Sequence, residues 1–254
     1  MEEALTALEL YNMGKNYLAI RNYSEAQVYL TKAVMKGSGK AGRDLMRLGQ
    51  IYADNGDAEA LTCFQVLANH GSVEACLLLG GMYRDGVLTK RSIDLAFDYF
   101  GEAYRLGSAR AAYEAGMLIW PDVFRDNGAR ECAKEWFRAA AEEGYDPAYL
   151  QEGLLFCDDS EKQMGEALEW FGKAADKGDV DAMMYAANIH LEGQGVPQDF
   201  PKAISFLERA SEAGSIKADQ VLADIYGNGP AKYRDKVKAL EYRTKVRLGH
   251  ERKI

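Results

Sequence analysis

The sequence repeats one pattern of small residues along most of its length. A glycine or alanine recurs inside an apolar, helix-like segment at spacings of 31 to 37 residues, and a second glycine that is expected to end a helix recurs in step with it. Because one helical hairpin cannot bury its apolar face alone, a repeat of this length predicts an array of packed hairpins. The small residues are Gly14, Gly49, Gly80, Gly116, Gly153, Ala187 and Ala223, and the helix-ending glycines are Gly37, Gly71, Gly107, Gly144, Gly178, Gly214 and Gly249.

Seven repeats of this kind predict an all-α solenoid that forms a single domain over residues 1–254. A glycine within a helix costs about 1 kcal/mol relative to alanine. The recurring small residue therefore predicts a point where two helices approach too closely to leave room for a larger side chain. The approximate repeats are 7–37, 42–71, 73–107, 109–144, 146–178, 180–214 and 216–249, followed by a short basic tail at 250–254.

The junctions between repeats are short and carry residues that suit the start of a helix. A serine or aspartate follows most of the helix-ending glycines within two residues, and such side chains accept a hydrogen bond from the first free amides of a helix. Connections this short require neighbouring hairpins to pack against each other. The expected capping residues are Ser72, Ser108, Asp146, Asp179 and Ser215, with Pro147 at the first helical position after Asp146.

The composition describes an ordered, helix-rich chain, with 48% hydrophobic residues, 28% charged residues and only five prolines. The formal net charge of −8 lacks the surplus of lysine and arginine on which nucleic-acid affinity depends, so nucleic acid is not an expected partner. The charge is uneven, since residues 229–254 carry a net +6 and residues 142–181 a net −9. We expect both segments to be solvated surfaces of the array.

The sequence contains no apolar run near the roughly 18 residues that a membrane-spanning helix needs, and its acidic start does not resemble a signal peptide. We therefore expect a cytoplasmic protein that does not bind membranes. The cysteines Cys63, Cys76, Cys132 and Cys157 occupy different repeats at positions that do not recur. A disulfide framework would show regular spacing, so we expect reduced, packed thiols.

Side chains suited to catalysis or metal binding are scarce. The three histidines, His70, His190 and His250, lie in no metal-binding motif, and His190 takes a position that other repeats give to an aromatic residue. We expect a packed imidazole there, and a packed indole at Trp170, which is in register with second-helix aromatics of other repeats. The sequence predicts no catalytic residue, no metal site and no cofactor, and hence a protein that is not an enzyme.

The recurring positions follow the consensus A-x3-L-G-x2-Y, then G-x-G-V-x2-D, then K-A-x2-W-[FY]-x-K-A-A-x2-G. The best local matches are Ala75, Leu79, Gly80 and Tyr83; Gly193, Gly195, Val196, Asp199, Lys202 and Ala203; and Ala167, Trp170, Phe171, Lys173, Ala174, Ala175 and Gly178. Over roughly residues 7 to 249 the chain resembles the Sel1-like repeat family, which is related to tetratricopeptide repeats. The resemblance implies a right-handed α/α superhelix whose first helices line a concave face, and a scaffold or adaptor function for other proteins.

By analogy with tetratricopeptide repeats, first-helix residues at offsets −3, +1 and +4 from the small residue line the concave face. Across the middle of the array these positions carry large apolar side chains, which favour a contact surface for a protein or peptide partner. The alternative is that several of them pack against neighbouring hairpins. The expected partner-binding residues are Arg84, Tyr113, Met117, Trp120, Leu150, Leu154, Met184, Asn188 and Leu191.

Two other functions stay open at this point. One is an enzyme-associated role in handling cell-wall or glycan fragments, which some proteins of the resembled family suggest. The other is self-association through the last repeat, which departs from the pattern of the others. The oligomeric state is not determined by the sequence, although a monomer is favoured.

Overall fold

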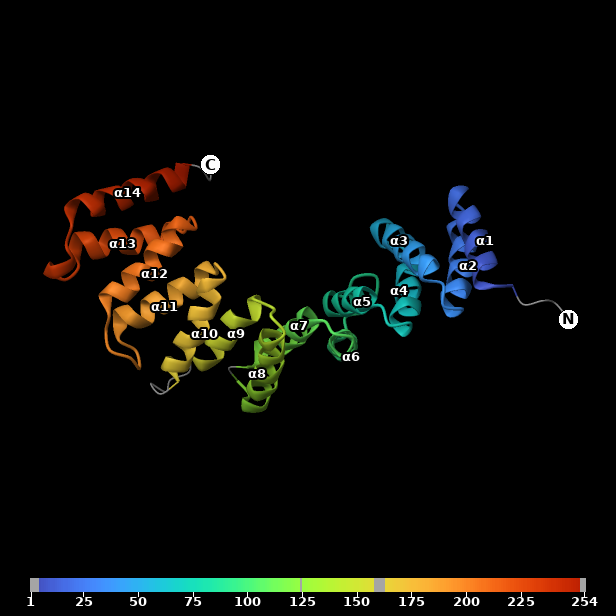
Figure 1. Cartoon of the computed structure of the whole chain (residues 1–254), viewed down its shortest axis with the longest axis horizontal. Coiled ribbons are helices and arrows are strands. Elements are labelled where there is room, and N and C mark those ends of the chain that lie inside the picture. The colour runs from blue at the N-terminus through green and yellow to red at the C-terminus, as the bar shows by residue number, and fades with distance from the viewer. Residues whose placement is uncertain (1–4, 124, 158–162, 252–254) are drawn as a thin grey trace. The chain divides into compact units, whose positions relative to one another are not determined.

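The computed structural model describes residues 5–123, 125–157 and 163–251. This described part contains fourteen α-helices and two short 3-10 helices, with no β-strand among them (Figure 1). The chain divides into two compact units, residues 1–136 and 137–254, and the boundary lies inside the eighth α-helix. The prediction of an all-α chain built from successive helices is therefore confirmed, whereas the prediction of one single domain stays a prediction.

Unit 1 contains seven complete α-helices, one 3-10 helix and the first part of an eighth α-helix. These are α1 (Ala7–Ala19), α2 (Tyr23–Met35), α3 (Gly39–Asn55), α4 (Glu59–Asn69), α5 (Val73–Asp85), α6 (Ile93–Arg105), α7 (Ala109–Ile119), η1 (Trp120–Asp122) and α8 (Asn127–Glu142). Within this unit α1 packs against α2, α3 against α4 and α5 against α6, and each pair also packs against the next helix along the chain.

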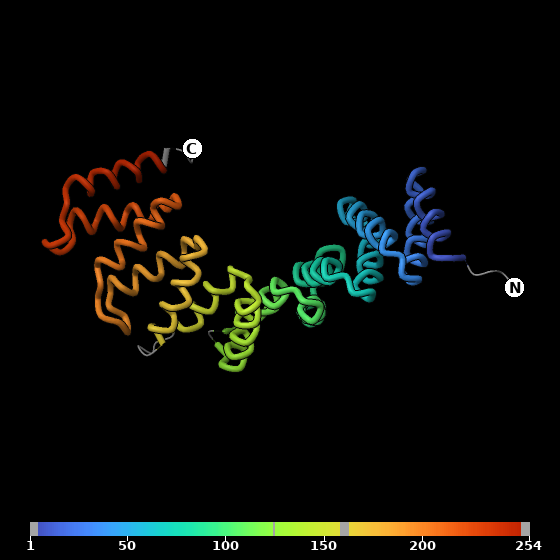
Figure 2. Tube along the Cα trace, viewed as in Figure 1, coloured from blue at the N-terminus to red at the C-terminus, as the bar shows by residue number. Residues whose placement is uncertain are grey.

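Unit 2 begins within α8 and continues the same arrangement, which can be followed along the Cα trace in Figure 2. The helix pairs α9–α10, α11–α12 and α13–α14 form hairpins, and α10 and α12 pack against the hairpins that follow them. Its further helices are α9 (Pro147–Phe156), α10 (Met164–Asp176), α11 (Val180–Glu192), α12 (Phe200–Glu212), α13 (Ile216–Asn228), η2 (Ala231–Tyr233) and α14 (Lys236–Glu251).

The recurring small residue is the point where the two helices of a hairpin touch. A large side chain of the second helix lies directly on the first-helix glycine, and it is fully buried in each case. A Cβ atom built on these glycines would come within 2.5–2.8 Å of that side chain, which is closer than real Cβ contacts allow. The prediction of close helix approach is therefore confirmed for the pairs Gly14–Leu30, Gly49–Phe64, Gly80–Phe100 and Gly153–Phe171.

Aromatic rings stack one turn beyond these contacts. In several hairpins the ring three residues after the small residue stacks on a second-helix ring, with centroids 5.4–6.2 Å apart. The pairs are Tyr17–Tyr29, Tyr83–Tyr99, His190–Phe206 and Tyr226–Tyr242. Trp170 stacks on Tyr149, and Lys173 lies over its ring at 3.7 Å from the centroid. The packed roles predicted for His190 and Trp170 are therefore confirmed.

The helix ends follow the predicted pattern at most junctions. Six of the seven helix-ending glycines adopt positive φ angles between 80° and 94°. The seventh prediction was wrong, because α14 continues through Gly249 to Glu251. A Cβ on Gly249 would approach Ile216 to 2.8 Å, so this glycine permits a close contact with α13 inside a continuous helix.

Four of the five predicted caps are confirmed. The side chains of Ser72, Ser108, Asp179 and Ser215 each accept a hydrogen bond from the amide three residues later. Asp146 makes no such bond, because its backbone is already helical, whereas a capping residue typically has an extended backbone. Its carboxylate instead pairs with the Lys177 ammonium at 3.0 Å. The prediction of a cap at Asp146 was therefore wrong.

Two adjacent glycines of α5 allow a direct test of the close contact. Gly80→Ala should destabilise the protein by about 1–3 kcal/mol, because the new methyl group would overlap the ring of Phe100. Gly81→Ala should leave stability unchanged or raise it by up to about 1 kcal/mol, because nothing lies within 4 Å of a Cβ there. Urea unfolding followed by circular dichroism measures both, and equal effects of the two substitutions would contradict the close-contact interpretation.

Candidate partner-binding sites

Two of the predicted partner-binding residues, Arg84 and Met117, line the same cavity in unit 1. The cavity has a volume of about 470 Å³ and lies among the end of α5, the start of α6, the end of α7 and η1. Both side chains are half-buried, which places them at a surface rather than in the core. The complete lining is Arg84, Asp85, Arg91, Ile93, Met117, Leu118 and Pro121.

Arg84 is held in place by two carboxylates. Its Nε donates to Asp85 Oδ1 at 2.8 Å, and one of its terminal nitrogens donates to Glu114 Oε2 at 2.7 Å. The hydrogen bond with Asp85 raises the pKa of Arg84, and the same bond lowers the pKa of the Asp85 carboxyl group. Arg91 in turn donates from its Nε to the carbonyl oxygen of Arg84 at 3.1 Å. The polar side chains of the cavity lining are therefore held in place by hydrogen bonds, and the rest of the lining is apolar.

The other predicted residues of unit 1 lie on the helix and turn that close this cavity. Tyr113 belongs to α7 and Trp120 begins η1, where Pro121 follows it, and both side chains are half-buried. The helix α7 stops at Ile119, directly before Trp120 and Pro121.

The predicted residues of unit 2 are more involved in packing. Leu150 and Leu154 lie against a buried cluster that includes Phe171, whereas Met184 and Leu191 lie against a second cluster in unit 2. Asn188 is exposed on α11. The alternative that some of these side chains pack between hairpins thus holds in part, and their role in partner binding stays a prediction.

A larger cavity occurs at a place that the sequence interpretation did not select. It has a volume of about 530 Å³ and lies where the ends of α2 and α4 meet the starts of α3 and α5. The signal for it is a change of spacing. The small residue Gly49 lies twelve positions after Gly37, whereas the corresponding small residue lies nine positions after the helix-ending glycine at each later junction, for example Gly80 after Gly71.

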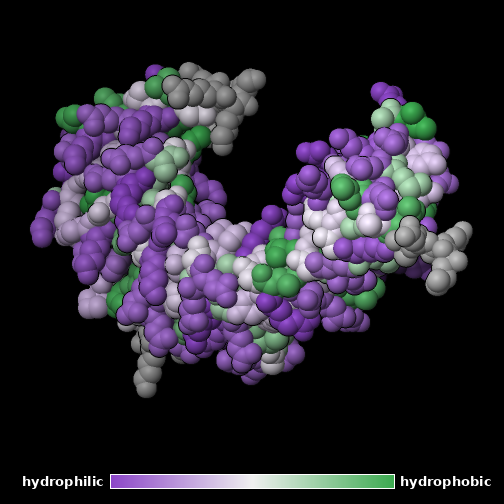
Figure 3. All heavy atoms as spheres, turned by 45° about the vertical axis from the view of Figure 1, so that its right-hand side comes forward, coloured by the Kyte–Doolittle hydropathy of each residue, from purple (hydrophilic) through white to green (hydrophobic). Residues whose placement is uncertain are grey.

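The apolar side chains on the protein surface are divided among small areas. On the face shown in Figure 3, hydrophilic side chains predominate and apolar side chains gather in small separate patches. A partner that binds this face would meet several small contact areas rather than one continuous apolar strip.

Two of the four cysteines are buried thiols. Cys63 and Cys76 are buried free cysteines, and burial raises the pKa of the Cys63 thiol to about 12, so that thiol is a poor nucleophile in the folded chain. Among the described residues there is no group of three or more histidine, cysteine, aspartate or glutamate side chains placed to hold a metal ion. Of the helices in the described ranges, none is both long and apolar enough to cross a bilayer.

His190 is a buried titratable ring of unit 2. It stacks on Phe206, and within the described structure its Nδ1 has no hydrogen-bond partner. Burial lowers the pKa of His190, the positive charge of Lys202 lowers it further, and Asp199 opposes the shift. The folded protein therefore resists protonation of this ring.

This depressed pKa predicts an acid-sensitive contribution to stability. As the pH falls, His190 of the unfolded chain gains a proton near the ordinary pKa of 6.5, while His190 of the folded chain does not. The contribution of the neutral ring to the free energy of unfolding is therefore fully present above that pH, and it declines as the pH falls toward the lower pKa of the folded state. His190→Phe should reduce this decline, because the equivalent position of the preceding repeat already holds Phe156. Thermal melts of both proteins from about pH 7.5 down to about pH 5 measure the difference, and parallel pH profiles would contradict the assignment to His190.

Comparison with protein families gives six matches to the Sel1 repeat. They cover residues 4–38, 73–108, 109–145, 149–179, 180–215 and 218–242. Residues 39–72, which form α3 and α4, are not covered by a match. Six of the seven predicted repeats are thus recognised, and the unmatched one borders the larger cavity.

Comparison with individual proteins agrees with this family. The chain is 33% identical over 192 residues to an uncharacterized protein, NMB1327, of Neisseria meningitidis serogroup B, covering 74% of this chain and 39% of that protein. It is 37% identical over 124 residues to the Sel1-repeat-containing protein YjcO of Escherichia coli K12, covering 49% of this chain and 52% of YjcO. The chain thus spans about half or less of the length of these relatives.

Among solved structures, a Sel1 repeat protein from Oxalobacter formigenes is similar in fold. Its TM-score is 0.62 at 23% identity, and the match covers 94% of this chain and 99% of that chain. The predicted α/α solenoid fold is therefore confirmed.

Proposed function

Because the chain belongs to the Sel1 repeat family, whose members are generally non-catalytic interaction scaffolds, we propose that it binds a peptide or protein partner through first-helix faces. The observation that carries this proposal is the cavity that Arg84 and Met117 share. The position of each residue in its repeat predicts that it lies on the partner-binding face. Their meeting at one cavity supports a contact site on that face.

The chemistry of this cavity suits a segment of polypeptide. Ile93, Met117 and Leu118 offer apolar surface for one side chain, and methionine adapts to partners of different shape. Arg84 and Asp85 are oriented by their mutual hydrogen bonds, so the remaining donor hydrogens of Arg84 and acceptor lone pairs of Asp85 can bind main-chain groups at little entropic cost. Tyr113 and Trp120, which lie on the adjoining α7 and η1, would extend the contact surface with aromatic area.

The proposed site in unit 2 rests on fewer observations. Leu150, Leu154, Met184 and Leu191 are half-buried, so each retains some surface for a partner while it packs against its own hairpins. Asn188 supplies an exposed amide that can donate and accept hydrogen bonds.

The proposal predicts that Met117 contributes to partner affinity more than to stability. A partner is first captured from native lysate with the intact chain and identified by mass spectrometry, and its affinity is then measured by calorimetry. Met117→Ala should weaken binding about tenfold, which corresponds to about 1.4 kcal/mol. Met35→Ala is the matched control, because Met35 is an exposed methionine of α2 outside this cavity. Equal affinities for the two variants would exclude the Arg84–Met117 cavity as the binding site.

Self-association is a second candidate, favoured by the last helix. Val237, Leu240 and Leu248 of α14 are 68%, 65% and 47% exposed, and their spacing places them on one side of the helix. These side chains form an exposed apolar face on α14, which a second copy of the chain could cover.

This second candidate predicts a concentration-dependent oligomer. Leu240→Glu should shift the protein toward monomer in sedimentation equilibrium, because a charge would be placed in the apolar contact. Val87→Glu serves as the control, because Val87 is 50% exposed in unit 1 and distant in sequence from α14. A wild-type protein that remains monomeric at high concentration would rule out this candidate.

A further inference from the structure

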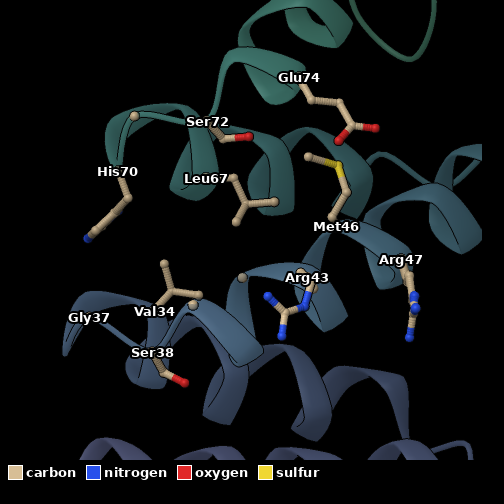
Figure 4. Close-up of a pocket in the computed structure, with 13 residues that line it drawn as sticks. Val34, Gly37, Ser38, Arg43, Met46, Arg47, Leu67, His70, Ser72 and Glu74 are labelled. Carbon is tan, nitrogen blue, oxygen red and sulfur yellow. The ribbon is translucent and has the colours of Figure 1, made fainter. Parts of the chain in front are cut away.

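The junction between the first two hairpins contains an extra turn of helix. The helix α3 has 17 residues, whereas the other first helices have between 10 and 13. The capping residue Ser38 directly follows the helix-ending glycine Gly37, and several later helices have the same arrangement of glycine and cap. The cap is thus in its usual place while Gly49 is displaced along the helix, so the additional residues lie at the start of α3. The cavity of about 530 Å³ lies beside this extra turn (Figure 4).

Two glycines keep this cavity open. Gly39 and Gly42 lie in the extra turn, and neither has the positive φ angle that would require glycine. A Cβ on Gly39 would have no atom within 4 Å, and a Cβ on Gly42 would meet only Leu67 at an ordinary 3.7 Å. Close packing therefore does not explain these glycines, although Gly42, inside the helix, costs about 1 kcal/mol of helix stability relative to alanine.

Two other junctions carry larger side chains at the corresponding positions. The positions two and five residues after the helix-ending glycine are Val73 and Cys76 at the next junction, and Val180 and Met183 in unit 2. Cys76 and Met183 are buried in their clusters. The first junction, by contrast, has glycine at both positions, and it borders the hairpin that lacks a Sel1 match.

The lining combines an apolar floor with a basic side. In Figure 4, Val34 and Leu67 point toward each other across the cavity, and Met46 lies beside them. Arg43 and Arg47 extend from α3 along one edge of the lining. A cavity of this size can hold more than one amino-acid side chain.

The charge around the cavity differs in sign from that of the whole chain. Residues 36–47 contain four basic side chains and one acidic side chain, in a protein of net charge −8. Arg47 pairs with Asp44 at 3.4 Å, whereas in the described part of the chain Arg43 has no hydrogen-bond or ion-pair partner among the other side chains. Glu74, at the start of α5, is the acidic member of the lining.

We propose that this cavity is an anchor subsite for an acidic peptide segment of a protein partner. One large aliphatic side chain of the segment fills the space between Val34, Met46 and Leu67, and a neighbouring carboxylate pairs with Arg43. The amino-terminal end of α3 adds to the attraction, because helix N-termini favour negative charge. This subsite rests on the proposed scaffold function. It specifies that the bound segment of the partner is acidic, which the Arg84–Met117 cavity does not.

The experiment uses the intact chain and a random peptide library displayed on phage. Peptides enriched on the wild type are synthesised with a fluorescent label, and their affinities are measured by anisotropy. The enriched sequences should place leucine, isoleucine or methionine next to aspartate or glutamate. Gly42→Leu, which fills the cavity, and Arg43→Glu, which reverses the charge, should each weaken these peptides about tenfold or more, equivalent to about 1.4 kcal/mol.

The control for cavity filling is Gly172→Leu on α10, where a Cβ would have nothing within 4 Å, and it should leave affinity unchanged. Thermal melts verify that each variant is folded, and Gly42→Leu should not lower the melting temperature because leucine favours helix. Failure to enrich any peptide, enrichment of peptides without acidic residues, or equal binding by Gly42→Leu would each overturn the subsite.

Two further outcomes separate this subsite from the other proposals. Peptides that are weakened by Met117→Ala but not by Gly42→Leu would overturn the subsite and support the Arg84–Met117 cavity. Oligomerisation of the wild type that Gly42→Leu abolishes would assign the cavity to a second copy of the chain, and so would overturn the peptide subsite as well.

Discussion

The hairpins depend on one contact, in which a large side chain of the second helix rests on a glycine of the first. Phe100 on Gly80 illustrates it, because any Cβ at residue 80 would lie 2.5 Å from the ring. The contact sets the distance between two helix backbones, and Tyr83 and Tyr99 can then stack one turn further along. Since the second helix covers one side of the first, the opposite side of the first helix remains available for contacts with neighbours or partners.

Most of this architecture could be predicted because it follows from local rules that repeat. Residues such as Gly71 and Ser72 end one helix and begin the next by backbone geometry and a single hydrogen bond. The two wrong predictions arose where tertiary contacts override those rules. Asp146 has a helical backbone and its carboxylate pairs with Lys177, and Gly249 permits α14 to approach Ile216 instead of ending the helix.

The candidate sites were less predictable, because the repeat register tells which side of a helix a residue occupies but not what covers that side. Met117 and Leu154 hold equivalent kinds of position, yet Met117 lines a cavity while Leu154 lies against a buried cluster. The difference depends on the surrounding helices, such as the early end of α7 at Ile119. The larger cavity did have a sequence signal, the longer interval between Gly37 and Gly49, but spacing alone does not tell whether an added turn is filled by side chains.

An inserted turn is tolerated here because each hairpin of a solenoid contacts only its neighbours. Ala41, in the inserted turn of α3, is fully buried, and Leu45 and Leu48 still pack in the core of unit 1, so the insertion retains its apolar contacts. The glycine contact between Gly49 and Phe64 is also unchanged. A repeat array can therefore acquire a new cavity at one junction without altering the contacts that hold the other hairpins. In such a protein the repeated positions maintain the fold, and departures from the repeat, such as Gly39 and Gly42, are where binding specificity can arise.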